Sequence, residues 1–212
     1  MRLPAFIEYA LGKLTSNIKA HDAKLFTKGP AFTDFPQPTL QLSCPECGPS
    51  GSTMKLHHTQ VGDESKDRFP DLTWSRVEDA EEYILLCEDA DLPIPVVVFH
   101  GLFYAIPATT TAVTASDMDP VQKDGDGKDS NVLMVKGGFK YLKNIQGSHY
   151  AGPKPLLGHG PHRYFYQLVA LKEPVNVDKL GGKVTKEGLG AAIVGNVVGW
   201  GQWVGVYERK WE

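Results

Sequence analysis

The chain has 212 residues, a formal net charge of −3 at pH 7, and 42% hydrophobic and 22% charged residues. This composition is typical of one globular domain, and we expect residues 1–212 to form it. The small negative charge argues against nucleic acid as a partner, and the apolar runs are too short for an integral membrane segment. No secretory signal is evident and the cysteine count is odd; we therefore expect a cytoplasmic protein.

The first predicted element is a helix at the N-terminus. Apolar residues recur with helical spacing between residues 4 and 19, and Pro4 suits a first helical turn. We therefore predict that residues 1–24 are an extension carrying an amphipathic helix packed on the domain. An organelle targeting peptide is the alternative, although Glu8, Asp22 and the scarcity of arginine argue against it.

A cysteine pair follows in a proline-rich region. Cys44 and Cys47 could supply half of a zinc site, and His57 and His58 lie within reach along the chain. A structural zinc site normally shows a second pair with regular spacing. We therefore expect free thiols, and predict neither a metal nor a cofactor.

Two apolar segments predict the central strands. Residues 82–91 read as a strand whose buried face ends in Asp89 and Asp91. Residues 96–106 are the most apolar segment and predict a strand buried on both faces. His100 lies in the middle of that strand, where a buried imidazole needs a hydrogen-bond partner.

The following segments predict one long loop, a helix and a closing strand. Residues 108–131 are rich in Thr, Asp, Gly and Ser, which is typical of a surface loop or lid. Residues 124–129 faintly resemble a calcium loop but lack its ligand spacing. Residues 185–198 predict a glycine-interrupted helix, and residues 203–207 alternate as a strand. The short strands and two helices together predict a mainly β protein built as a sandwich.

The most informative stretch covers residues 153–171, where a loop rich in proline and glycine leads into an apolar strand. The strand opens with His162, Arg163 and Tyr164. Because side chains alternate along a strand, His162 and Tyr164 share one face and Arg163 points away. A rigid loop with free backbone N–H groups, beside an imidazole and a phenol, can receive a small anion. His159, in the loop, is expected at the rim.

Three segments in this order resemble the phosphatidylethanolamine-binding protein family, which also contains the Raf kinase inhibitor protein. The short gap at residues 94–99 is similar to the bacterial and archaeal branch of that family, and other features suggest a fungal member. The segments that carry the resemblance are Asp89–Pro93, the strand around His100 that ends at Ile106 and Pro107, and Gly152–Pro155 followed by His162–Tyr164.

The resemblance implies a β-sandwich with Greek-key connections and a pocket for phosphate, acetate or a phospholipid headgroup. Such a small anionic ligand is the expected partner, and a homodimer is left open. The family often has a tryptophan where this chain has Gly101, so a wider pocket is expected. The pocket residues carried over by motif are Asp89, Asp91, His100, Pro155, His162 and Tyr164.

These residue types suit anion binding, because a histidine can donate one N–H to an anion while a carboxylate fixes its other nitrogen. They also suit acid–base catalysis by His100, His162 and Asp89. Some fungal family members are implicated in joining maleic-anhydride monomers, so the resemblance also implies an enzyme or accessory protein of secondary metabolism. Whether the chain is an enzyme is left open. In a further alternative His100 is a core histidine with its hydrogen bonds satisfied.

Overall fold

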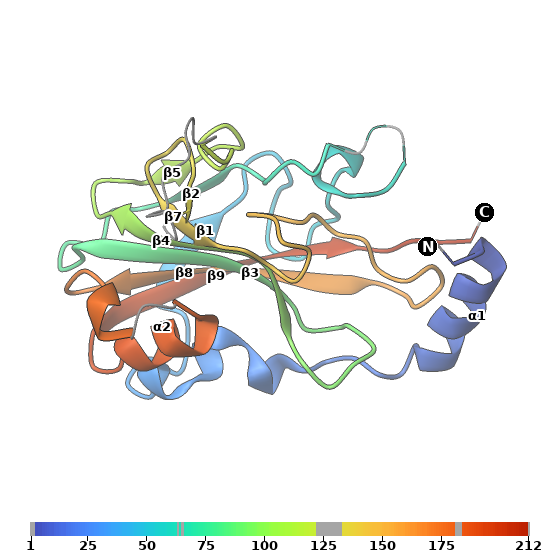
Figure 1. The fold of residues 1–212 in the computed structure, drawn as a ribbon, viewed down its shortest axis with the longest axis horizontal. Coiled ribbons are helices and arrows are strands. Elements are labelled where there is room, and N and C mark those ends of the chain that lie inside the picture. The colour runs from blue at the N-terminus through green and yellow to red at the C-terminus, as the bar shows by residue number, and fades with distance from the viewer. Residues whose placement is uncertain (1–2, 63, 65, 122–132, 181–183, 212) are drawn as a thin grey trace.

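The structure is a computed structural model that describes residues 3–62, 64, 66–121, 133–180 and 184–211. Its strands pair into one nine-stranded sheet in the order β5-β2-β1-β9-β8-β3-β4-β7-β6 (Figure 1). The strands are β1 (Leu40–Ser43), β2 (Leu72–Trp74), β3 (Glu82–Asp89), β4 (Val98–Pro107), β5 (Ala112–Val113), β6 (Leu133–Met134), β7 (Lys140–Leu142), β8 (His162–Leu171) and β9 (Val197–Tyr207).

The described helices are few and short. They are α1 (Ala5–Thr15), α2 (Lys186–Ala192) and the 3-10 helices η1 (Asp22–Lys24), η2 (Phe26–Lys28), η3 (Pro30–Phe32), η4 (Leu56–His58) and η5 (Val177–Leu180). Neither α-helix is long and apolar enough to cross a lipid bilayer. The prediction of a mainly β protein with an N-terminal and a C-terminal helix is confirmed.

The centre of the sheet is formed by the two strands predicted from their apolar runs and by their partners. All residues of β3 are buried, and β3 pairs antiparallel with both β4 and β8. Burial on both faces explains the apolar runs without alternation at residues 83–87 and 102–106. The buried Glu82, Glu88 and Asp89 of β3 have hydrogen-bond partners. The predicted strands 82–91 and 96–106 are confirmed, each within two residues at its ends.

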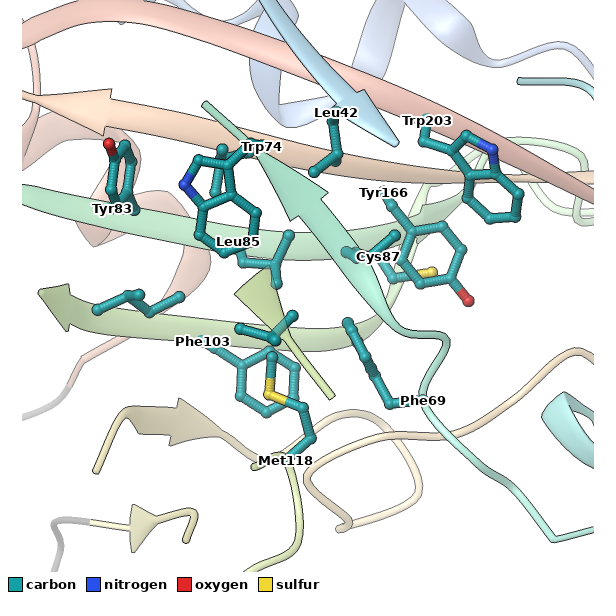
Figure 2. Close-up of a cluster of buried hydrophobic side chains, with 14 of the residues drawn as sticks. Leu42, Phe69, Trp74, Tyr83, Leu85, Cys87, Phe103, Met118, Tyr166 and Trp203 are labelled. Carbon is teal, nitrogen blue, oxygen red and sulfur yellow. The ribbon is translucent and has the colours of Figure 1, made fainter. Parts of the chain in front are cut away.

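The sheet curls strongly, as one aromatic contact shows. Trp74 of β2 packs against Tyr83 of β3 with 5.7 Å between ring centroids. Three strands separate β2 from β3 in the sheet order, which in a flat sheet would place them about 19 Å apart. Figure 2 shows the enclosed cluster, with Trp74 beside Leu85 and with Cys87 beside the Tyr166 ring. Greek-key sandwich topology stays a prediction, because the strands form one continuously paired, curled sheet.

Helix α1 forms where the sequence predicts it, but its apolar face does not pack on the sheet. Phe6 and Leu14 are 66% and 81% exposed, and Gly12 is the buried residue of the helix. Figure 1 shows α1 at one end of the molecule, beside the C-terminus. Glu8 forms an ion pair with Arg209, so the helix is held by polar contacts and by close backbone approach at Gly12.

Two further boundaries differ from the sequence-based expectation. Helix α2 stops at Ala192, and β9 begins at Val197, earlier than the sequence predicts. Glycines along β9, which allow close approach of β1, hide the strand pattern in the sequence. The predicted loop 108–131 contains the short strand β5 and buries Val113. Its calcium-like segment, residues 124–129, lies outside the described residues.

Candidate functional site

A cavity of about 260 Å³ opens where β3, β4 and β8 meet the proline- and glycine-rich loop. Three of the sequence-predicted residues line it: Asp89 at the end of β3, His100 on β4 and Tyr164 on β8. The register of the sheet explains this convergence, because Asp89 lies directly opposite Tyr164 in the antiparallel pair. The other lining residues are Leu92, Ile94, Val98, Phe99, Asn144, Ile145, Gln146, Ala151, Gly152 and Lys154.

His100 is held as a neutral imidazole. Its Nδ1 atom lies 2.5 Å from the carbonyl oxygen of Ala151, and only a protonated Nδ1 can donate to that acceptor. Burial lowers the pKa of His100, against the smaller opposing effect of the Asp89 carboxylate. The hydrogen therefore resides on Nδ1, and Nε2 carries a lone pair that can accept a proton.

Tyr164 supplies a neutral hydrogen-bond donor. Its hydroxyl is buried, its oxygen accepts from the Lys154 backbone N–H, and no described residue accepts the hydroxyl hydrogen. Burial, followed by the nearby Asp89 charge, raises the pKa of this phenol well above its usual range, so the hydroxyl keeps its proton. The ring meets His100 edge to face, with 5.1 Å between centroids. An orphaned buried donor that lines a cavity is suited to a polar ligand.

Asp89 and His162 form one end of a buried hydrogen-bonded chain. His162 Nδ1 lies 2.8 Å from Asp89 Oδ2, and its Nε2 lies 2.8 Å from His159 Nδ1. His159 Nε2 lies 3.0 Å from the carbonyl oxygen of Thr15, at the end of α1. The Thr15 carbonyl can only accept, so His159 carries its hydrogen on Nε2 and accepts from His162. With Asp89 as an ionised acceptor, His162 donates at both nitrogens and forms a buried ion pair with Asp89.

The remaining predicted pocket residues lie outside the cavity lining. His162 is fully buried in the chain just described, and His159 belongs to the same chain and not to an exposed rim. Asp91 accepts hydrogen bonds from Arg163 at 2.7 and 2.8 Å. Pro155 contributes its carbonyl oxygen, which accepts a hydrogen bond from Arg209 at 3.0 Å.

Arg163 is structural, in line with its predicted orientation away from His162 and Tyr164. Its guanidinium bridges Asp91 to Asp22, with a contact of 2.7 Å to each carboxylate. These two charges raise the pKa of Arg163. The bridge ties the segment that follows α1 to the ends of β3 and β8.

Sequence reasoning missed several groups around the cavity. Lys154 belongs to its lining: its backbone N–H donates to the Tyr164 hydroxyl oxygen, whereas its side-chain charge acts on Glu8 of α1. Asn144 donates from its side chain to the His100 carbonyl oxygen at 2.9 Å and so fixes the strand that carries this histidine. Asp67 accepts from the backbone N–H of Gly152, and burial raises its pKa. Lys154 lies inside the quoted glycine–proline motif and could have been found there, whereas Asn144 and Asp67 carry no sequence signal.

The wider pocket expected from Gly101 is not observed. Gly101 does not line the cavity, whereas the three preceding residues of β4, Val98, Phe99 and His100, do. A Cβ atom built at Gly101 would lie 3.0 Å from the Phe103 ring and 3.2 Å from the Tyr150 ring. This position therefore faces the core, and a missing indole there does not enlarge the site.

A second cavity, of about 810 Å³, lies between β4, β7 and α2. Its described lining contains Lys140, Lys143 and Lys186 but none of the six predicted pocket residues. Size alone does not identify a site, since chemistry needs convergent polar groups of suitable protonation. We therefore place the candidate site in the smaller cavity.

Comparisons with known proteins identify relatives in fungi and bacteria. A phomoidride biosynthesis cluster protein B of Talaromyces stipitatus is 36% identical over 97% of this chain and 82% of its own length. A protein of the same description from a fungus without an assigned species is 34% identical over 97% of this chain and 96% of its own length. Escherichia coli YbcL, described as a member of the mammalian PEBP family, shares the fold, with 24% identity and a TM-score of 0.59 over 80% of this chain and 98% of its own.

The family profile described as phosphatidylethanolamine-binding protein matches residues 46–208. This range holds β2 to β9 and every residue of the cavity lining. The resemblance noted from the sequence is thereby confirmed. The chain belongs to the phosphatidylethanolamine-binding protein family.

Proposed function

We propose that the cavity of about 260 Å³ binds a small carboxylate or phosphate anion. The observation that carries the proposal is the buried Tyr164 hydroxyl, a donor without a partner among the described residues. His100 Nε2 can accept the hydrogen of a partly protonated anion such as hydrogen phosphate. Asp89 does not repel such a ligand strongly, because its charge is paired with His162.

Calorimetric titration with inorganic phosphate and with maleate tests this proposal. Tyr164→Phe removes the hydroxyl alone, and binding should weaken about tenfold or more, since hydrogen bonds to charged groups contribute about 1.5–3 kcal/mol. Tyr104→Phe is the matched control, because this buried phenol does not line the cavity. Equal affinities of the Tyr164→Phe and Tyr104→Phe variants would exclude the proposed donor role.

A phospholipid headgroup offers the same phosphate chemistry as a free anion. Sedimentation with vesicles of phosphatidylethanolamine and phosphatidylcholine distinguishes the two sources. If the free anion is the ligand, phosphate binds but vesicles do not retain the protein. Vesicle retention that is lost in Tyr164→Phe would instead assign the site to a headgroup.

A second candidate function is acid–base chemistry in fungal secondary metabolism. Two observations favour it: the two fungal relatives are named for a biosynthesis cluster, and His100 presents a neutral, basic Nε2 beside the Tyr164 donor. In this role Nε2 takes a proton from the alkyl carbon attached to the C=C bond of an alkyl-substituted maleic anhydride. The electron pair of the broken C–H bond moves through the C=C bond into the conjugated carbonyl, and the Tyr164 hydroxyl donates to the resulting dienolate oxygen.

Hydrogen exchange on a substrate measures this step directly. An alkyl-substituted maleic anhydride, or its diacid, is incubated with the protein in D₂O, and deuterium uptake at the alkyl carbon attached to the C=C bond is followed by NMR. The wild type should accelerate uptake and His100→Gln should lose most of the acceleration, since general base catalysis contributes about 10²–10⁴-fold. Intact anion binding without accelerated exchange would leave the chain as a binding protein.

A further inference from the structure

A second cluster of ligand-type side chains lies outside the cavity, and we call Glu46, His57 and His58 the Glu46 cluster. One ligand atom from each of the three residues lies within 4.8 Å of the other two. Glu46 comes from the turn between the two cysteines, and the histidines come from η4. Twelve or fewer positions along the chain separate these residues, yet their side chains converge on one point.

His58 has the burial and the hydrogen bonding that are typical of a metal-binding histidine. Its ring is fully buried, and its Nδ1 atom lies 3.0 Å from the carbonyl oxygen of Arg68. The carbonyl accepts, so Nδ1 carries the hydrogen and Nε2 presents a lone pair. Metal-binding histidines show this same pairing of one nitrogen with a backbone carbonyl, which fixes the tautomer and ring orientation. Nε2 is buried and meets no strict hydrogen-bond geometry with a described residue, although the Cys47 thiol lies close enough to interact with the ring.

The orphaned nitrogens point at a carboxylate. His58 Nε2 lies 3.6 Å from Glu46 Oε1, and His57 Nε2, also buried and without a described hydrogen-bond partner, lies 3.7 Å from Glu46 Oε2. The lone pair on His58 Nε2 and a carboxylate oxygen repel each other unless positive charge lies between them. Four ligands about 2.0–2.1 Å from a tetrahedral zinc ion are about 3.3–3.4 Å from one another. The two spacings are thus within a few tenths of an ångström of a zinc shell.

The formal charge around the Glu46 cluster is negative, which favours a bound cation. The Arg68 guanidinium approaches Glu46 Oε2 at 3.7 Å, but it pairs more closely with both oxygens of Asp71, at 3.0 Å each. The Asp71 backbone N–H donates to Glu46 Oε1 at 2.8 Å and fixes the carboxylate. With both histidines neutral, the formal charges of Glu46, Asp71 and Arg68 sum to −1. A divalent cation would balance this group and satisfy both orphaned nitrogens.

We propose that Glu46, His57 and His58 bind one zinc ion, with the fourth coordination position open. Two histidines and one glutamate are a donor set that zinc accepts in proteins. Cys44 and Cys47 are free thiols, and Cys47 contacts His58, but neither belongs to the three residues whose ligand atoms converge. The turn between the two cysteines therefore contributes the Glu46 carboxylate to the convergent set.

The site would brace the loop that forms the cavity wall. The His58 carbonyl oxygen approaches Gly152 so closely that a Cβ atom at this glycine would collide with it. The Gln60 N–H donates to the Pro153 carbonyl at 3.1 Å. Zinc bound at Glu46 would hold this segment against the loop. The inference does not depend on the proposed function, because zinc binding is measured without any anion.

Zinc titration of the untagged, chelator-treated full chain tests the proposal, with calorimetry and competition against a chromophoric chelator as readouts. The wild type should take up one zinc ion per chain. Glu46→Gln and His57→Asn should each weaken binding by more than about 100-fold, since even outer-shell changes cost about 10–100-fold. His149→Asn is the matched control and should bind zinc like the wild type.

Thermal unfolding supplies a second measurement on the same proteins. Zinc binds the folded chain, so it should raise the unfolding midpoint of the wild type and of His149→Asn but not of Glu46→Gln. Glu46 and His57 are chosen because they are partly exposed, whereas a change at buried His58 could prevent folding. Uptake of less than one zinc ion per chain, or equal affinity in Glu46→Gln and the wild type, would overturn the proposal.

Discussion

His162 Nδ1 lies 2.8 Å from Asp89 Oδ2, and both side chains are closed off from solvent. This pair is the junction between the cavity and the N-terminal helix, because Asp89 lines the cavity and His162 continues through His159 to the Thr15 carbonyl. Its charges are paired internally, so the pair orients neighbouring groups and leaves Tyr164 and His100 as the reactive ones. The hydrogen bonds of this one buried pair therefore connect the anion cavity to the attachment of α1.

The first prediction concerns the charge of that pair. Asp89→Asn keeps the size of the side chain but leaves the buried His162 imidazolium without a counter-charge. Breaking a buried ion pair by removing one partner costs about 3–5 kcal/mol, and we expect that loss in the free energy of unfolding. Urea unfolding at pH 7 measures it.

An exposed ion pair serves as the control for Asp89→Asn. Asp119 pairs with Lys136 at 3.0 Å, and both side chains are more than half exposed. Asp119→Asn should therefore change the free energy of unfolding by no more than about 1 kcal/mol. Similar losses in the two variants would mean that Asp89 and His162 are not a buried ion pair.

The second prediction is a pH dependence at Asp91. Burial alone would raise its pKa, but hydrogen bonds from Arg163 and from the Ala20 backbone N–H lower the pKa overall. A carboxyl whose pKa is depressed by folding contributes stability above its unfolded value of about 3.9 and loses it as the pH falls through the folded value. The stability difference between wild type and Asp91→Asn should therefore be full at pH 7 and shrink below about pH 4. A difference that stays constant in acid would contradict the assignment.

The third prediction concerns the protonation of His100. Folding lowers its pKa mainly by burial, so it should stay neutral at pH 6.5, near the usual midpoint of about 6.5. Its stabilising contribution is complete above the unfolded pKa and is lost as the pH falls through the folded one. NMR of side-chain nitrogens should show hydrogen on Nδ1 and none on Nε2, with titration below pH 6.5. The His100→Gln spectrum assigns the signal, and a midpoint above 6.5 would remove His100 as a neutral base.

The central strands could be predicted from sequence because burial on both faces leaves an uninterrupted apolar run, as at 82–91 and 96–106. The packing of α1 could not. Its apolar spacing predicts a helix correctly, but spacing does not reveal which face meets the domain. The contact is made at Gly12, where the absence of a side chain matters and hydropathy carries no signal.

The site was predictable in its composition and only in part in its geometry. Strand parity places Tyr164 toward the cavity, and His100 also lines it. Parity equally points His162 to that side, yet its ring is enclosed by Asp89 and His159. Whether His100 or His162 is accessible from the cavity depends on His159 in the loop and on the Thr15 carbonyl of α1, which is distant in sequence. No local pattern encodes that choice.

The last prediction tests how α1 is attached. A Cβ atom at Gly12 would collide with the Leu157 carbonyl oxygen and lie 2.9 Å from the His159 backbone nitrogen. Because these are backbone atoms, they cannot move aside as a flexible side chain would. Gly12→Val should therefore lift α1 off the loop, break the contact between Thr15 and His159, and accelerate amide hydrogen exchange across residues 5–15.

Helix propensity makes the test of Gly12→Val sharp. Valine is a better helix former than glycine by a few tenths of a kcal/mol, whereas replacing alanine by valine costs up to about 0.7 kcal/mol. Ala10→Val, at an exposed position of the same helix, is therefore the control. If the helix were held by propensity alone, Gly12→Val would slow exchange and Ala10→Val would speed it. Because close packing at Gly12 holds the helix, we expect the larger acceleration in Gly12→Val, and the reverse order would refute this attachment.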